Sequence, residues 1–370
     1  MTLIKQVYNA RTRWRKGQRE DKTELQYLIS KLEKHQYVYF TRANSEETTL
    51  EDLFFAHPDS IDMLNTFLTI LVMDSTYKTN THRMSLFEIV GVTVTSTKMT
   101  YSVVFVFLSF EQENNFIWAL EMLVGLLTSK RNMPKVIVTD RDPALMKAVA
   151  EVLPKTDHVH CYFHIENNVK SRCITDCRVN AKPSKAKFVG KVTKETDDDK
   201  HCELVKKIVR AWRDVVNSPT EDSFAIAWLT FKDEVCGPFS LFVKYVEETV
   251  LPLKKHFLRA WTNKYLHLGC RSTNIVESTH AQLKTYSRSS VGDLTSCWDE
   301  IDKMLKNQLG EIQGSFGRSI IVMVHKYKKK TNYSLSWMGM SLRPLWVSSM
   351  KNLYALGHSA LLKKTVVVCK

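Results

Sequence analysis

The segment "LVMDSTYKTN", residues 71–80, decides the fold, because an apolar run that resembles a buried strand ends there in the carboxylate of Asp74. A charged residue directly after a buried strand suggests that this edge of the sheet has a function that requires charge. The segment "KVIVTD", residues 135–140, repeats this pattern and ends in Asp140. If the two strands are parallel neighbours, both carboxylates lie at the edge where open α/β sheets bind ligands. The sequence therefore predicts a pair of acidic side chains at one edge of a sheet.

The surrounding pattern predicts an α/β fold. The expected elements are strands at 67–74, 87–97 and 101–110, a helix at 112–127, a strand at 135–140, a helix at 142–153 and a strand at 157–163. The first three strands are joined by hairpin-type connections, and helical crossovers join the others. This order predicts a mixed five-stranded sheet flanked by helices.

Charge is distributed unevenly along the chain. The net charge is +14, yet residues 37–164 carry an excess of five acidic groups, and the segments on either side of them are basic. This pattern suits a protein that holds cations inside and a polyanion outside. A basic surface that serves only solubility is the alternative. No apolar run reaches the length of a membrane span, no signal peptide is expected, and the eight cysteines are typical of reduced thiols.

Two carboxylates at one edge repel each other unless a cation lies between them. Mg²⁺ or Mn²⁺ prefers oxygen ligands, and two such ions can catalyse phosphodiester displacement. That chemistry usually needs a third carboxylate, and Glu277, in the predicted helix at 272–287, is the best candidate. Taken singly, an Asp at the end of a strand is more often a turn former or a helix cap, and a helical Glu more often faces solvent.

The chain resembles the transposase domain of Mutator-like elements, the group that includes the ancestors of plant far-red-response transcription factors. The resemblance lies in "DSTYKTN" (74–80), "FEIVGVTVTS" (87–96), "FIWALEMLVGLL" (116–127), "VIVTDRDPALMKAV" (136–149), "HCYFHIENNV" (160–169) and "RSTNIVESTHAQLK" (271–284). These stretches occur in the order of the family, and the resemblance as a whole covers roughly residues 50–320.

The resemblance implies an RNase H-like fold with an all-helical insertion before the last catalytic acidic residue. The catalytic triad of the family falls on Asp74, Asp140 and Glu277, which would bind two Mg²⁺ (or Mn²⁺) ions. The expected partners are double-stranded DNA, both transposon ends and target, and further copies of the chain in a homodimer or larger assembly. The expected localisation is the nucleus, without membrane association.

The resemblance also divides the chain. The expected parts are a basic N-terminal helical region (1–60), the first part of the catalytic core (61–165), the helical insertion (166–265), the completion of the core with Glu277 (266–320) and a basic C-terminal tail (321–370). Within this division, residues 178–201 are expected to form a polar loop, and a helix is expected at about 293–316.

Several residues near the triad are accessory candidates. The family carries a Cys-x-x-His element, matched here by Cys161 and His164, with Phe163 where the family usually has Trp. His164 could orient a phosphate or a metal ligand, whereas Cys161 could equally be a small core residue. Lys78 and Arg141 could contact phosphate or be solvated. His280, one turn after Glu277, could act on DNA or protons, or fill an interface.

Histidines and cysteines cluster at 158–177, which raises the alternative of a zinc site. Their spacing matches no zinc-finger pattern. The favoured function is therefore a cut-and-paste DNA transposase. The alternatives are a domesticated DNA-binding transcriptional regulator that does not cleave, and a generic metal-dependent nuclease.

Overall fold

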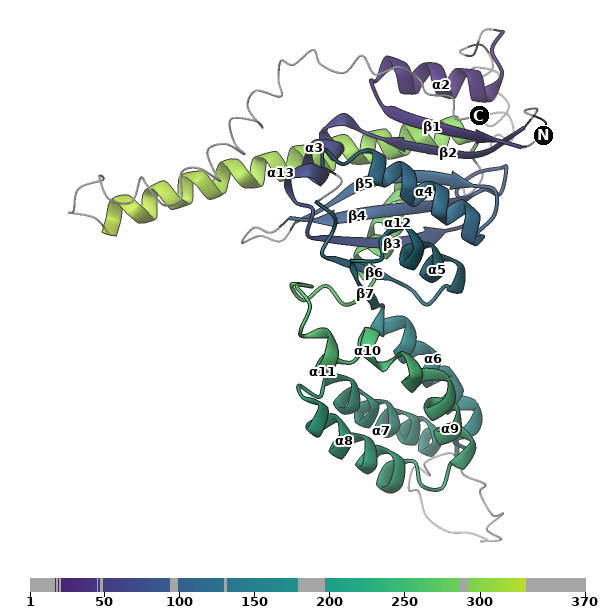
Figure 1. Cartoon of the computed structure of the whole chain (residues 1–370), viewed down its shortest axis with the longest axis vertical. Coiled ribbons are helices and arrows are strands. Elements are labelled where there is room, and N and C mark those ends of the chain that lie inside the picture. The colour runs from purple at the N-terminus through teal and green to yellow at the C-terminus, as the bar shows by residue number, and fades with distance from the viewer. Residues whose placement is uncertain are drawn as a thin grey trace, which may run out of the picture.

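A seven-stranded mixed sheet forms the centre of the molecule (Figure 1). The computed structural model describes residues 17, 19, 21–44, 46, 49–93, 99–129, 132–178, 197–286 and 292–330. The strands are β1 (Val38–Ala43), β2 (Leu50–Ala56), β3 (Ile70–Thr76), β4 (Ser85–Val92), β5 (Thr100–Leu108), β6 (Val136–Thr139) and β7 (Asp157–His160). Their order in the sheet is β1-β2-β5-β4-β3-β6-β7. β3, β6 and β7 are parallel, and all other neighbours are antiparallel.

The predicted mixed α/β sheet is confirmed, but the predicted number of five strands was too low. The five expected strands form the contiguous part β5-β4-β3-β6-β7, and the hairpin β1–β2 extends it at one edge. The sequence interpretation assigned this hairpin to a helical region and a loop. β2 was missed because Asp52 interrupts its apolar run. In the folded chain Asp52 is fully buried and forms an ion pair with Arg42 of the neighbouring strand.

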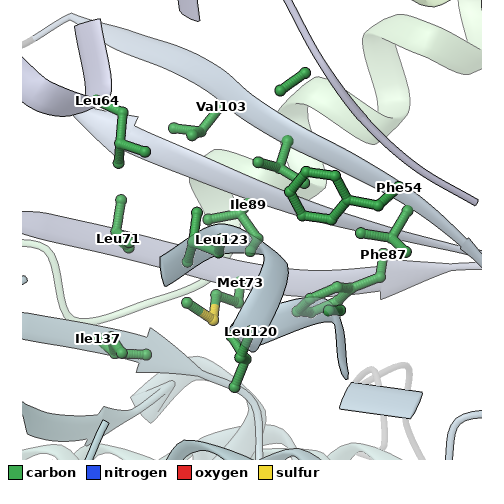
Figure 2. Close-up of a cluster of buried hydrophobic side chains, with 14 of the residues drawn as sticks. Phe54, Leu64, Leu71, Met73, Phe87, Ile89, Val103, Leu120, Leu123 and Ile137 are labelled. Atoms are coloured by element: carbon green, nitrogen blue, oxygen red, sulfur yellow. The ribbon is translucent and has the colours of Figure 1, made fainter. Parts of the chain in front are cut away.

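One face of the sheet is covered by α3 (Pro58–Thr66), α4 (Glu113–Gly125) and α5 (Pro143–Val152). The alternation of side chains along a strand directs Leu71 and Met73 of β3 to this face. There they pack in one apolar cluster with residues of α4 such as Leu120 (Figure 2). Asp142 caps the first turn of α5 by accepting a hydrogen bond from the Leu145 amide at 2.8 Å, and this cap fixes where the connection after β6 ends.

The opposite face is covered by α2 (Glu24–Lys34), α12 (Asn274–Tyr286) and α13 (Leu294–Lys330). A capping box starts α2 at Thr23. α12 lies against β3 and β4, where Val276 packs with Val72 and Val90. Because strand residues alternate between faces, the even-numbered side chains of β3 and β4 project toward α12.

Helices between β7 and α12 form a second apolar cluster, built around the buried indole of Trp212. These helices, named the helical unit, are α6 (Tyr162–Asp176), α7 (Asp197–Asn217), α8 (Glu221–Leu229), α9 (Ser240–Tyr245), α10 (Lys254–Phe257) and α11 (Arg259–Thr262), with π-helical turns at Thr230–Val235 and Val246–Val250 and a 3₁₀ turn at Leu251–Leu253. The helical unit lies beyond β7 at one end of the molecule (Figure 1). Its treatment as an insertion with the boundaries given above stays a prediction.

α13 is longer than the helix predicted at about 293–316 and continues to Lys330. Part of the expected N-terminal helix, most of the expected loop at 178–201 and most of the basic tail lie outside the described residues, at 1–16, 179–196 and 331–370. Among the helices that the structure describes, none has the length and apolar character needed to cross a lipid bilayer.

Candidate functional site

The register of the sheet places Asp74 and Asp140 next to each other. Val72 of β3 lies opposite Val138 of β6 in the parallel ladder. Asp74 and Asp140 are each two residues further along, so they reach the same level on adjacent chains and point to the same face as these valines. That face is the one that α12 covers.

Both carboxylates lie in an environment that disfavours their charge. Asp74 is 9% exposed. Burial, together with the negative charge of Asp140, raises its pKa to about 6, although the nearby His280 and His164 lower it in part. Burial likewise raises the pKa of Asp140, which His164 opposes. The positive charges near the two carboxylates therefore do not balance their negative charges.

Glu277 comes to this edge from the first turn of α12, but its carboxylate contacts His164. The distance from Glu277 Oε1 to His164 Nε2 is 3.3 Å, and the Thr273 hydroxyl donates to the same oxygen at 3.3 Å. Thr273 Oγ1 also lies 3.4 Å from His164 Nδ1. Both side chains of the pair are about one-third exposed, so Glu277 can be reached from solvent.

His164 is held in a charged state by its neighbours. The hydrogen bond with Cys161, together with the charges of Cys161, Glu277 and Asp74, raises the pKa of His164 to about 9, although burial opposes this change. The thiol of Cys161 is buried at the start of α6 and accepts a hydrogen bond from the Thr273 amide at 3.2 Å. Burial opposes ionisation of this thiol, but its hydrogen bonds with His164 and Thr273 lower its pKa overall. These contacts link the start of α6 to the start of α12.

A fourth carboxylate, which the sequence analysis missed, belongs to the same region. Glu88 of β4 lies directly opposite Asp74 in the antiparallel ladder and is fully buried. Its Oε2 is 3.2 Å from Nε2 of His280, one turn after Glu277 on α12. Within the described part of the chain neither Glu88 oxygen accepts a hydrogen bond, so the contact is an ion pair when His280 is protonated. It attaches α12 to the sheet beside Asp74.

The remaining accessory candidates lie around this edge. Lys78 is exposed on the loop after β3 and has a left-handed backbone with φ of 62°. Arg141 follows Asp140, and its charge helps to lower the pKa of His160. From α12, Lys284 donates to the hydroxyl of Thr76 at 2.9 Å. Of the predicted accessory residues, His164 and Cys161 contact the immediate surroundings of the carboxylates, and His280 contacts Glu88.

The chemistry of the donors fits a divalent cation, although the three carboxylates are not gathered into one set. Asp74 and Asp140 supply adjacent oxygens in a setting that a cation would relieve. Glu277 is bound to His164 instead. Accordingly, no group of three His, Cys, Asp or Glu side chains in the described ranges is close enough to hold a metal ion. Asp74 and Asp140 could hold an ion as they stand, and Glu277 could join them after leaving His164.

The comparisons with known proteins agree with the resemblance found in the sequence. Residues 70–168, from β3 into α6, match the family model of the MULE transposase domain. The chain is similar to Protein FAR-RED IMPAIRED RESPONSE 1 of Arabidopsis thaliana, with 23% identity over 254 residues, 68% of this chain and 29% of that protein. It is also similar to Protein FAR1-RELATED SEQUENCE 11 of the same plant, with 27% identity over 46% of this chain and 23% of that protein.

Another similar protein is the PKS-NRPS hybrid synthetase cheA of Chaetomium globosum, with 25% identity over 81% of this chain but 6% of that protein. The chain thus spans less than a third of the curated relatives named here. Among solved structures, the HTLV-2 integrase catalytic core domain in complex with magnesium matches 36% of this chain and 96% of that one, with 16% identity and a TM-score of 0.19.

Proposed function

We propose that this chain, which carries a MULE transposase domain, is the catalytic part of a DDE-type DNA transposase with an RNase H-like core. The observation that carries the proposal is that Asp74 and Asp140 each lie two residues beyond the last pair of the parallel ladder between β3 and β6, with Glu277 on the helix that covers them. Carboxylates at such an edge, with raised pKa values and without a matching positive charge, are typical of a metal-dependent active site.

The residues have distinct roles in this proposal. Asp74 and Asp140 bind the divalent cations, Mg²⁺ or Mn²⁺, and Glu277 completes the set after its carboxylate separates from His164. When bound, the ions supply the activation of the attacking oxygen and the stabilisation of the leaving oxygen. His164, released from Glu277, then faces the bound phosphodiester with its Nε2. Lys78 and Arg141 contact backbone phosphates from the loops that follow β3 and β6.

The substrate in this proposal is double-stranded DNA. The chain cuts the strand at a transposon end and joins the freed 3′ hydroxyl to target DNA in the nucleus, and it acts as a homodimer or larger assembly on paired ends. Positioning and electrostatic stabilisation account for most of the rate enhancement in phosphoryl transfer of this kind, so no covalent enzyme intermediate is needed.

A second candidate function is a DNA-binding transcriptional regulator derived from a transposase, which keeps the fold without cleaving. The observation that favours it is the Glu277–His164 contact, which holds the third carboxylate away from the other two. The two functions differ in one measurable respect: a regulator binds DNA but leaves it intact in Mg²⁺ or Mn²⁺.

The test is a nicking and strand-transfer assay on DNA that carries the ends of the element. We expect Asp140→Asn to abolish metal-dependent nicking while DNA binding is kept, because the variant removes one metal ligand and one repelling charge. Asp142→Asn is the matched control, since asparagine preserves the cap of α5 and cleavage should persist. Nicking that survives in Asp140→Asn contradicts the triad. A wild-type chain that binds without nicking supports the regulator, and nicking without strand transfer supports a generic nuclease.

A further inference from the structure

Two arginines without acidic partners lie where the helical unit meets the carboxylate edge. Arg259 is exposed at the start of α11, and Arg271 lies in the loop that leads into α12. In the described part of the chain, no carboxylate forms an ion pair with either guanidinium. Four other arginines are paired with carboxylates, namely Arg19 with Asp293, Arg42 with Asp52, Arg172 with Asp176 and Arg213 with Glu166, whereas Arg83, Arg141 and Arg210 form no ion pair among the described residues either.

The guanidinium of Arg271 is held in place by neutral groups alone. Its Nη2 donates to the backbone oxygen of Phe257 at 2.7 Å, and its Cζ lies 5.5 Å from the ring centroid of Tyr162. Its Nε is buried and has no hydrogen-bond partner among the described residues. The N–H groups that do not bond to Phe257 donate to no described residue, but the buried Nε–H is out of reach of a ligand from solvent, so only the N–H groups of Nη1 and Nη2 could bind one.

The hydrogen bond from Arg271 to the backbone oxygen of Phe257 brings Arg271 to the chain segment that carries Arg259, two residues further along. Burial lowers the pKa of Arg271, and the positive charge of Arg259 lowers it further. Keeping two like charges near each other, one of them partly buried, costs free energy that an anion between them would recover. Among the described residues no carboxylate forms an ion pair with either arginine, which leaves this position open to an anion from outside the chain.

The position of Arg271 ties this pair to the carboxylate edge. Its backbone oxygen accepts a hydrogen bond from the amide of Tyr162 at 3.1 Å, next to Cys161. Two residues further along the chain, Thr273 contacts His164 and Glu277. A ligand on the arginines would therefore lie beside the carboxylates, on the side that faces the helical unit.

We infer that Arg259 and Arg271 bind a phosphate of the DNA backbone next to the phosphodiester that lies at the carboxylates. The identification of DNA as the source of this phosphate rests on the proposed function. Arg271 supplies a fixed planar fork from the sheet side, and Arg259 supplies an exposed charge from α11. Together they direct the DNA strand from the carboxylate edge onto the helical unit, which gives the helical unit a role in substrate binding.

The test measures equilibrium binding of the full 370-residue chain to a mixed-sequence DNA duplex over a range of salt concentrations. Each lost phosphate contact lowers the slope of log K against log salt by about 0.9. The double variant Arg259→Ala/Arg271→Ala should therefore lower the slope by about 2 and weaken binding by about thirtyfold at roughly 0.15 M salt. Because Arg271 also holds the Phe257 carbonyl, Arg259→Ala alone is measured too, and it should lower the slope by about 1.

The matched control is Arg172→Ala. Arg172 also lies over a tyrosine ring, that of Tyr245, but its charge is paired with Asp176. This control should leave the slope unchanged. An unchanged slope and affinity in both Arg259→Ala and the double variant overturn the inference, and so does an equal loss in Arg172→Ala.

A second measurement separates this inference from the proposed function. Inorganic phosphate, added at constant ionic strength, should raise the thermal unfolding midpoint of the wild type more than that of Arg259→Ala. If phosphate has this effect but DNA is not bound, the anion site stands and the proposed DNA function fails. If DNA is bound and neither measurement responds to the arginine substitutions, the proposed function stands and this inference fails.

Discussion

Asp74→Asn should make the protein more stable at neutral pH, although it removes a residue of the candidate site. Asp74 is mostly buried on β3, where burial and the charge of Asp140 raise its pKa from 3.8 to about 6. Asparagine has nearly the same shape and carries no charge. The substitution therefore removes the unfavourable charge and leaves the strand and its neighbours in place.

The size of the effect follows from the shift in the pKa. Because the folded-state pKa lies about 2 above the unfolded value, ionisation of Asp74 lowers the free energy of unfolding by up to about 3 kcal/mol. The folded protein binds this proton more tightly than the unfolded chain, so wild-type stability falls as the pH rises from about 4 through about 6. The advantage of Asp74→Asn should thus be about 1–3 kcal/mol at pH 7–8 and vanish near pH 4.

The assay is urea unfolding, followed by tryptophan fluorescence, at several pH values between 4 and 8 in the presence of EDTA. Glu113→Gln is the control, because it neutralises an exposed carboxylate on α4 and should change stability by less than about 0.5 kcal/mol at every pH. An Asp74→Asn variant that is equally stable or less stable than wild type at pH 8 would refute the view that this edge holds excess negative charge.

Two further predictions concern the support of the site. His280→Ala should lower the unfolding free energy by about 3–5 kcal/mol in urea unfolding, because it leaves Glu88 buried without its partner. The double variant Glu88→Met/His280→Leu, which removes both charged groups, should be within about 2 kcal/mol of wild type in the same assay. A small loss of stability in His280→Ala would contradict the ion pair. Gly91→Ala should cost about 1–3 kcal/mol in the same assay, since the new Cβ would lie 2.3 Å from the Tyr101 ring; a neutral Gly91→Ala would show that Tyr101 has room to move.

The sequence predicted the elements whose signal is local. Asp74 and Asp140 each follow an apolar run, so their side chains could be assigned to one edge from the strand pattern alone, although β3 continues two residues beyond Asp74 to Thr76. The helix that carries Glu277 was also recognisable, from its apolar spacing and its N-terminal cap residues. These predictions succeeded because the periodicity of buried side chains depends on the element itself.

The parts that the sequence did not predict depend on contacts between distant segments. Glu88 lies inside a strand, where a charged residue normally indicates a solvent-facing position, and its partner His280 lies far along the chain. The pairing of Glu277 with His164 depends on how α12 docks beside α6, which no local pattern records. β2 was not predicted because Asp52 interrupts its apolar pattern, and the partner that allows Asp52 to be buried, Arg42, lies on the neighbouring strand.

The central claim is that Asp74 and Asp140 bind a divalent cation. The most direct measurement is equilibrium binding of Mn²⁺ to the protein, followed by electron paramagnetic resonance of the free ion, with competition by Mg²⁺. We predict saturable binding to the wild type that Mg²⁺ displaces, and loss of this binding in Asp74→Asn/Asp140→Asn. Equal binding in wild type and double variant, or no binding to the wild type at millimolar Mn²⁺, would contradict the account.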